Sequence, residues 1–167
     1  MLIRNEIPGD RVAVHALNAA AFETAAEAGL VDALREQARP LVSLVADDGG
    51  AVIGHILFSP VALPGHPGLA IMGLAPMAVA AAHRGRGVGS ALVREGLERC
   101  REIGCDAVVV LGHPAYYPRF GFVPAARFGI GCEYDAPAEA FMILELRPGA
   151  LAGAGGTVRY HAAFAAL

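Results

Sequence analysis

The sequence predicts a mixed α/β fold in which a mainly antiparallel sheet is flanked by helices, with residues 1–167 forming a single domain. Three patterns support this. Strand-like segments follow one another in the first half, a helical apolar spacing runs from Val88 to Ile103, and an unbroken apolar strand, Ala107–Leu111, comes after it. The strand-helix-strand order indicates a local parallel pair of strands around the long helix.

The first half of the chain contains recognisable helix starts. Leu2–Glu6 is expected to form a short strand, and Asp10 is a good N-cap for a helix that begins near Val12. Thr24 with Glu27 three residues later predicts a capping box for a second helix. Strands are expected at Leu41–Ala46, Ala51–Val61 and Leu69–Ala80, with a hairpin turn at Asp47–Gly50.

The second half is punctuated by glycine and proline. Gly104 is expected to end the long helix. Pro114–Phe120 is expected to be a short helix, and later strands are expected at Phe122–Pro124, Ala140–Leu146 and Thr157–Phe164.

Composition excludes several classes of protein. A hydrophobic content of 55% with 17% charged residues is typical of a folded chain, and a net charge of −3 argues against a general nucleic-acid binder. No apolar run is suited to span a membrane. Cys100, Cys105 and Cys132 form no CxxC pair, which favours reduced thiols and a cytoplasmic location. The histidines show no metal-ligand spacing, so no metal is expected.

A glycine-rich turn stands between the expected strand Leu69–Ala80 and the long helix. Its sequence is Arg84-Gly85-Arg86-Gly87-Val88-Gly89-Ser90. Glycines let backbone N–H groups approach an anion, and a helix N-terminus adds unpaired donors and a favourable dipole. Arg84 and Arg86 offer charge-assisted bonds to phosphate oxygens. The turn therefore predicts a phosphate-bearing ligand.

Two nucleotide-binding motifs do not fit this turn. A P-loop requires a lysine that is absent here. A dinucleotide-binding fingerprint (GxGxxG) counted from Gly85 has Ser90 where its third glycine should stand. The motif also needs an acidic residue at the end of the next strand, whereas Asp106 comes before that strand.

The spacing Arg-x-x-Gly-x-Gly at Arg84, Gly87 and Gly89 resembles the GNAT superfamily of N-acetyltransferases. The resemblance implies that residues 84–90 bind the pyrophosphate of acetyl-CoA. It also implies that the backbone of Met77, Ala78 and Val79 holds the pantetheine arm, with the Val79 N–H facing the oxyanion. The segment 116–122 is similar to the family's Tyr-x-x-x-Gly-Phe signature and makes Tyr117 the candidate general acid. Two departures concern Ala81, where the family commonly has proline, and Gly112-His113, where some members place asparagine.

The expected reaction is direct transfer of the acetyl group from acetyl-CoA to a primary amine. The amine must lose a proton, the oxyanion must be stabilised and the thiolate must leave. The sequence does not identify the base: a core or surface role is expected for His55, and Glu23 is as well explained as a solvated charge.

Other functions stay open at this point. A non-catalytic acyl-CoA-binding or sensing module would use the same turn, and a nucleotide-binding oxidoreductase ranks below both. The acceptor could be a small molecule or a peptide, and the first two helices with the loop 127–137 are expected to shape its site. The late strands also offer a surface for a homodimer, which the sequence does not establish.

Overall fold

The structure is a computed structural model that describes residues 1–167. By its contacts the chain divides into two compact units. The first comprises Met1–Ser59, Ala75–Gly96 and Ala162–Leu167, and the second comprises Pro60–Leu74 and Leu97–His161. Two strands and one helix run from one unit into the other: β3 (Ala51–Val61), β4 (Ile71–Val79) and α3 (Val88–Glu102). The expectation of a single domain stays a prediction.

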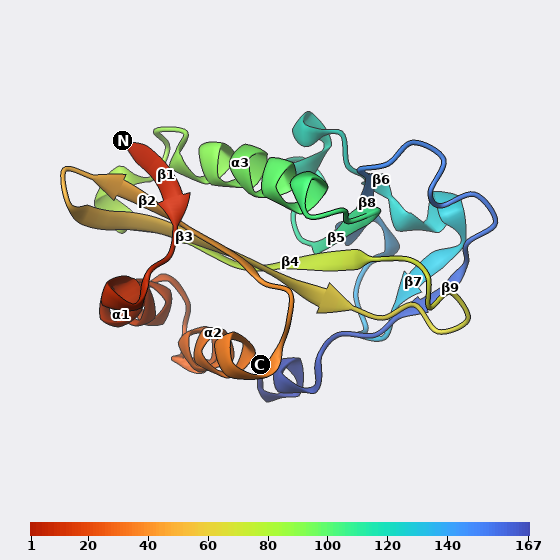
Figure 1. The fold of residues 1–167 in the computed structure, drawn as a ribbon, viewed down its shortest axis with the longest axis horizontal. Coiled ribbons are helices and arrows are strands. Elements are labelled where there is room, and N and C mark those ends of the chain that lie inside the picture. The colour runs from red at the N-terminus through yellow and green to blue at the C-terminus, as the bar shows by residue number, and fades with distance from the viewer. The chain divides into compact units, whose positions relative to one another are not determined.

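The first unit is an antiparallel sheet with helices on both faces (Figure 1). Its other elements are β1 (Leu2–Asn5), α1 (Arg11–Ala21), α2 (Ala26–Gln37) and β2 (Val42–Asp48). Strand β2 pairs with β1 and with β3. The two-residue connection Gly49-Gly50 has φ angles of 61° and 96° and joins β2 to β3 as a tight hairpin, as the sequence predicts.

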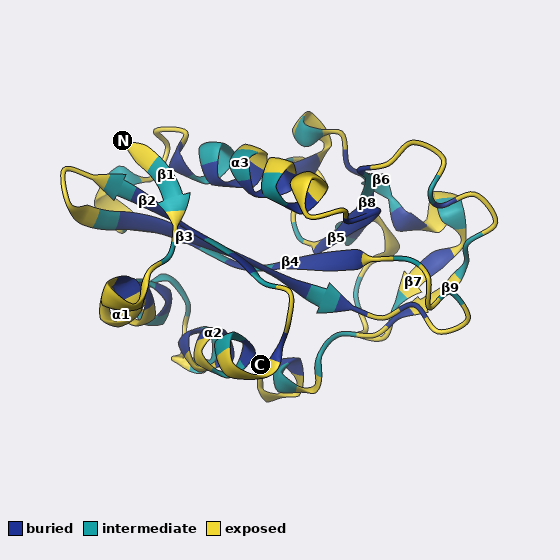
Figure 2. Cartoon of the chain, viewed as in Figure 1, coloured by how far each residue is buried: buried dark blue, intermediate teal, exposed yellow.

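Adjacent residues on β3 show why helices cover both faces of this sheet. Side chains alternate between the two faces of a strand. A Cβ on Gly54 would meet Val88 and Leu92 of α3, whereas the next residue, His55, is hydrogen-bonded to Asn18 of α1. Helix α3 therefore packs on one face and α1 on the other. The buried side of α3 is visible as a dark stripe in Figure 2.

The second unit includes the first residues of β4, up to Leu74. It contains β5 (Ala107–Leu111), β6 (Val123–Pro124), β7 (Ile130–Cys132), β8 (Phe141–Glu145) and β9 (Gly156–Val158). Strand β4 pairs in parallel with β5, which confirms the predicted parallel pair. Strand β8 lies antiparallel to both β5 and β6, and β7 pairs in parallel with β9 in a separate small sheet.

The core of the second unit lies between its two sheets. Val109, Phe141 and Ile143 from the larger sheet share one buried cluster with Ile130 and Val158 from the smaller one. Helix α3 ends at Glu102, close to the predicted stop, because Gly104 takes a left-handed φ of 87°.

Three local predictions need correction. Thr24 and Glu27 form no capping box: the Thr24 hydroxyl accepts the Ala26 N–H at 3.2 Å, and one Glu27 carboxylate oxygen is buried without a partner. Asp10 does precede α1, but its carboxylate accepts bonds from Arg4 and the Ile7 N–H and makes no cap bond. Thr157–Phe164 is not one strand, since β9 ends at Val158 and a 3-10 helix begins at Ala162.

Candidate functional site

The glycine turn lies in the first unit, directly before α3 (Figure 1). Residues 84–87 are exposed, whereas Val88 is only 4% exposed and fixes the first turn of the helix to the sheet. Gly85 and Gly87 have φ angles of 75° and 82°, and a Cβ on either residue would meet no atom within 4 Å. Glycine is therefore needed here for its left-handed backbone and not for packing space.

The turn ends in a helix N-terminus that faces solvent. The Ala91 N–H donates to the Gly87 carbonyl at 3.0 Å, which makes Gly87 the residue before the helix. The N–H groups of Val88 and Gly89, the first two residues of the helix, have no acceptor within it, by the geometry of any helix. Their partial positive charge, next to an open glycine backbone, suits an anion.

Arg84 joins this turn to the end of β4. Its Nε–H donates to the Val79 carbonyl at 3.2 Å. The predicted strand segment Met77–Val79 and the predicted phosphate turn thus lie together in the first unit, connected by a side-chain hydrogen bond. Arg86 is exposed and makes no ion pair, so two guanidinium groups stand at the turn with no carboxylate neutralising them.

Gly54 and Gly96 allow α3 and β3 to approach closely, although the sequence did not assign either glycine to the site. A Cβ on Gly54 would lie 2.9 Å from Val88 Cγ1 and 3.0 Å from Leu92 Cδ1. Gly96 likewise gives room for the ring of Phe58 on β3. The signal for Gly54 is present in the sequence, because a glycine within an apolar strand often marks a close approach of another element.

His55 is a buried structural residue, as expected, and not a base. It is fully buried, with the Asn18 amide 3.1 Å from Nδ1 and the Ser43 hydroxyl 2.9 Å from Nε2. Burial, with a smaller contribution from the positive charge of Arg35, lowers the pKa of His55 to about 3. Ser43 in turn donates to the Glu6 carboxylate at 2.9 Å, and Glu6 pairs with Arg35 at 2.6 Å.

Tyr117 lies in the second unit, at the start of the 3-10 helix Tyr117–Phe120. Its ring packs against Tyr116 and Phe122, and a Cβ on Gly112 would lie 2.5 Å from Tyr117 Cε2. Tyr117 is 8% exposed, and burial raises the pKa of its phenol to about 12. The phenol is therefore fully protonated at neutral pH and available as a donor.

The remaining histidine, cysteine and acidic residues form neither a metal site nor a disulfide. No group of three or more histidine, cysteine or acidic side chains is arranged to hold a metal ion. All three cysteines are free thiols. None of the helices is both long enough and apolar enough to cross a bilayer. Asp106 has a structural role, since it accepts bonds from the Ala70 N–H and from Arg147.

The fold and the turn together define an acyltransferase of the GNAT type. The model of the acetyltransferase (GNAT) family matches residues 11–122, so the chain belongs to that family and the sequence-based resemblance is confirmed.

Similar proteins agree with this assignment. The uncharacterized N-acetyltransferase YhbS of Escherichia coli K12 is 46% identical over 165 residues, or 98% of each chain. A crystal structure of E. coli YhbS in complex with CoA superposes with a TM-score of 0.92 at 44% identity, covering 98% of this chain and 91% of that one. A GNAT acetyltransferase from Brucella melitensis in complex with acetyl-CoA has a TM-score of 0.79 at 37% identity, covering 98% of this chain and 97% of that one.

Proposed function

We propose that this protein transfers the acetyl group of acetyl-CoA to a primary amine. The observation that carries the proposal is the exposed, left-handed glycine turn at the start of α3, tied to the end of β4 by the Arg84–Val79 bond. The CoA and acetyl-CoA complexes of the E. coli and Brucella proteins support acetyl-CoA as the donor. The acceptor is proposed as a small-molecule or peptide amine, and the free cysteines favour the cytoplasm as the compartment.

The donor site is assigned to two neighbouring segments. The backbone N–H groups and arginines of residues 84–90 (Arg84, Gly85, Arg86, Gly87, Val88, Gly89 and Ser90) would bind the pyrophosphate. Because the Arg84 Nε–H is already used by Val79, the terminal nitrogens of this guanidinium are the ones left for phosphate oxygens. The backbone of Met77, Ala78 and Val79 would hold the pantetheine arm along the end of β4.

The transfer itself needs a hydrogen-bond donor at the oxyanion and another at the leaving sulfur. The Val79 N–H is assigned to the oxyanion. Tyr117 is assigned to the sulfur, as its phenol keeps its proton at neutral pH. An ordinary thiol has a pKa of about 8.5, so full proton transfer from a phenol with a pKa of about 12 is uphill. Tyr117 would thus act mainly by donating a hydrogen bond to the developing thiolate, with solvent or the amine supplying the final proton.

Replacing Tyr117 by phenylalanine separates an enzyme from a non-catalytic acyl-CoA-binding module. A lost hydrogen bond to a charged group costs about 1.5–3 kcal/mol, so kcat should fall by roughly tenfold to a hundredfold. The Kd for acetyl-CoA should not change. The measurement is thiol release with a panel of amines, combined with calorimetric titration of acetyl-CoA. Equal turnover by the wild type and Tyr117→Phe would remove Tyr117 from the mechanism, and binding with no acceptor found would favour the sensing module.

The donor site is tested separately by the double variant Arg84→Ala with Gly87→Asp. The variant removes the Arg84 cation and places a carboxylate at position 87, whose backbone is left-handed. Together these changes should raise the Kd for acetyl-CoA by at least about tenfold. A matched control is Arg127→Ala with Gly65→Asp: Arg127 is exposed, and Gly65 also has a positive φ, 92°, with open space around it. If both double variants bind acetyl-CoA like the wild type, the assigned site is wrong.

A further inference from the structure

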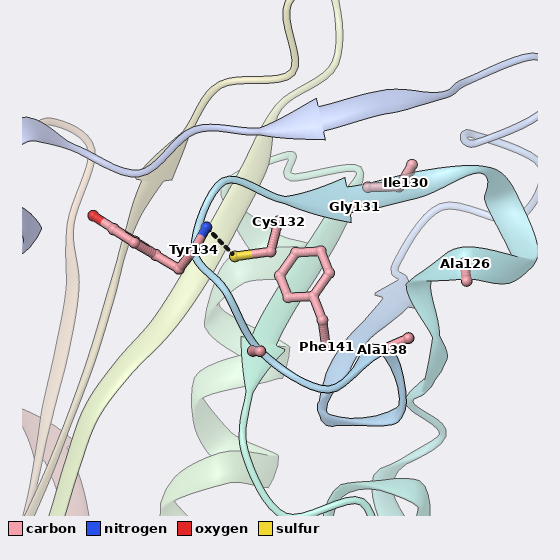
Figure 3. Close-up of a pocket in the computed structure, with 8 residues that line it drawn as sticks. Ala126, Ile130, Gly131, Cys132, Tyr134, Ala138 and Phe141 are labelled. Carbon is pink, nitrogen blue, oxygen red and sulfur yellow. Dashed lines mark hydrogen bonds between the residues drawn. The ribbon is translucent and has the colours of Figure 1, made fainter.

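A small hollow in the second unit has no part in the donor site described above. Its volume is about 200 Å³, and it lies among β7, the start of β8 and the segments before each of them (Figure 3). The buried side chains Ile130 and Phe141 contribute to its wall. The other apolar contacts come from small residues: Ala126, Gly131, Ala136 and Ala138. Because these four residues have no side chain larger than a methyl group, they leave space open beside Phe141.

The interior of the hollow is mainly apolar, and no charged side chain lines it. Its thiol, Cys132, already accepts the Tyr134 N–H at 3.4 Å, and burial raises the pKa of that thiol, so it stays neutral. The Tyr134 ring points away from Phe141 in Figure 3 and packs against Tyr160, with ring centroids 5.6 Å apart. An occupant would therefore meet hydrocarbon surface and one aromatic face, which favours an apolar group.

The segment that lines the hollow carries acidic residues next to the lining ones. Asp135 stands between two lining residues and Glu139 follows the lining residue Ala138; both side chains are exposed and neither forms an ion pair. The third acid of this segment, Glu133, is engaged, because it accepts the Tyr160 N–H at 2.7 Å and lies 3.9 Å from Arg159. A mainly apolar hollow in a segment with two unpaired carboxylates is complementary to a cation attached to a hydrocarbon group.

The hollow and Tyr117 belong to the same end of the β5–β8 strand pair. Phe141 is paired with Leu111, the last residue of β5. The next residue, Gly112, donates its N–H to the Ala140 carbonyl at 2.9 Å and lies under the Tyr117 ring. Phe141 and the Tyr117 ring lie on opposite faces of this strand pair, because Leu111 and Gly112 are adjacent and point to opposite sides. The second unit thus places the candidate hydrogen-bond donor and the hollow at the same strand end, from which an amine in the hollow would reach around the end of β5.

We infer that this hollow is the acceptor subsite and that it selects primary amines carrying a phenyl-sized or branched-alkyl group. The inference rests on the proposed acetyl transfer to an amine. The hydrocarbon group would occupy the hollow against Phe141, and Asp135 and Glu139 would attract the ammonium group before it loses its proton. The volume matches a single ring or short branched chain, and is below that of pockets for larger ligands.

The test compares 2-phenylethylamine with ethanolamine, which has the same ammonium group but no apolar end. Wild-type kcat/KM should be at least about tenfold higher for 2-phenylethylamine. Ala138→Trp fills the hollow and should remove most of that preference, mainly by raising KM, without changing the Kd for acetyl-CoA. Ala152→Trp is the matched control, because Ala152 is also an exposed alanine of the same unit and does not line the hollow.

A binding measurement on the wild-type protein keeps this test independent of catalysis and of variant folding. 2-Phenylethylamine should shift the amide NMR signals of Ile130, Cys132 and Phe141, and Asp135→Asn with Glu139→Gln should weaken that binding. Absence of these shifts, or a substrate preference that Ala138→Trp leaves intact, overturns the inference while acetyl transfer stands. Binding in the hollow with no transfer to any amine supports the subsite and contradicts the proposed function instead.

Discussion

His55 shows how one buried residue holds several elements of the first unit together. Its two ring nitrogens contact Asn18 on α1 and Ser43 on β2, and Ser43 leads on to Glu6 and Arg35. The Asn18 amide also donates to the Val14 carbonyl at 3.0 Å, which identifies Nδ1 of His55 as the accepting nitrogen and Nε2 as the protonated one. Protonating Nδ1 would place two donors face to face in a fully buried site.

This arrangement predicts that stability falls as the pH is lowered from 7 to 5. The unfolded chain binds a proton at His55 near pH 6.5, whereas the folded chain resists protonation until a pH of about 3. Acid therefore favours the unfolded state throughout that window, by about 2 kcal/mol between pH 7 and pH 5. Urea unfolding at both pH values checks this, with His55→Gln as the comparison, because the variant should lose most of the difference.

The carboxylates do not obscure the result. The pKa values of Asp10 and Asp106 are already lowered below 3.8, chiefly by a bond from Arg4 and by the Ala70 N–H respectively, so their stabilisation is lost only below this window. The remaining histidines are the same in both proteins, so their contribution cancels in the comparison. An equal pH dependence in the wild type and His55→Gln would show that His55 is protonated in the folded state.

At the scale of elements, the position of α3 depends on β3 as much as on the glycine turn. The helix begins at Val88, whose side chain occupies the space that a Cβ on Gly54 would need. A substitution on a buried strand can therefore move the start of the helix, where the donor phosphates are proposed to bind, without touching the turn itself.

Gly54→Ala tests that dependence. Its Cβ would lie 2.9 Å from Val88 Cγ1, so we expect a loss of about 1–3 kcal/mol of stability from overpacking and weaker binding of acetyl-CoA. Gly29→Ala is the control, since Gly29 lies inside α2 with open space around it and should gain up to about 1 kcal/mol. Urea unfolding and acetyl-CoA titration measure both effects. An acetyl-CoA affinity equal to the wild type in a destabilised Gly54→Ala would separate the helix start from ligand binding.

The elements that the sequence could predict are those defined by local pattern. Strand β3 has the expected bounds, and α3 ends at Glu102, within one residue of the expected end. Strand β7 was missed because three residues carry no periodicity and its partner β9 is remote in sequence. The predicted capping box does not form because the Thr24 hydroxyl accepts the Ala26 N–H and not the Glu27 N–H. Backbone geometry decides between these two N–H groups, and residue types alone do not determine it.

The candidate site was only partly accessible to the same reasoning. The glycine turn is a contiguous motif, so its residues and its place before a helix could be predicted. The Arg84–Val79 bond, the His55 contacts and the hollow at Phe141 each depend on residues from separate elements. The sequence marks the segment 127–137 as acidic, but it does not show that β7 lies within it, nor does it distinguish the engaged Glu133 from the unpaired Asp135.

At the scale of the whole molecule, the proposed donor and acceptor contacts fall in different units. Residues 77–79 and 84–90 belong to the first unit, and Tyr117 and the hollow at Phe141 belong to the second. Acetyl-CoA and an acceptor amine should therefore leave distinct protection patterns in amide hydrogen exchange, because locally bound amides open less often.

We predict that acetyl-CoA slows exchange in peptides covering residues 77–91, and that 2-phenylethylamine slows it in peptides covering residues 126–141. Acetyl-CoA at a hundred times its Kd adds about 2.7 kcal/mol of stability and should raise Tm by roughly 5–10 °C for a chain of this size. The Arg84→Ala, Gly87→Asp protein should lose both the local protection and most of the Tm shift, whereas a nicotinamide dinucleotide should produce neither in the wild type. Protection by acetyl-CoA confined to residues 126–141 would contradict the donor assignment, because the pyrophosphate would then bind away from the start of α3.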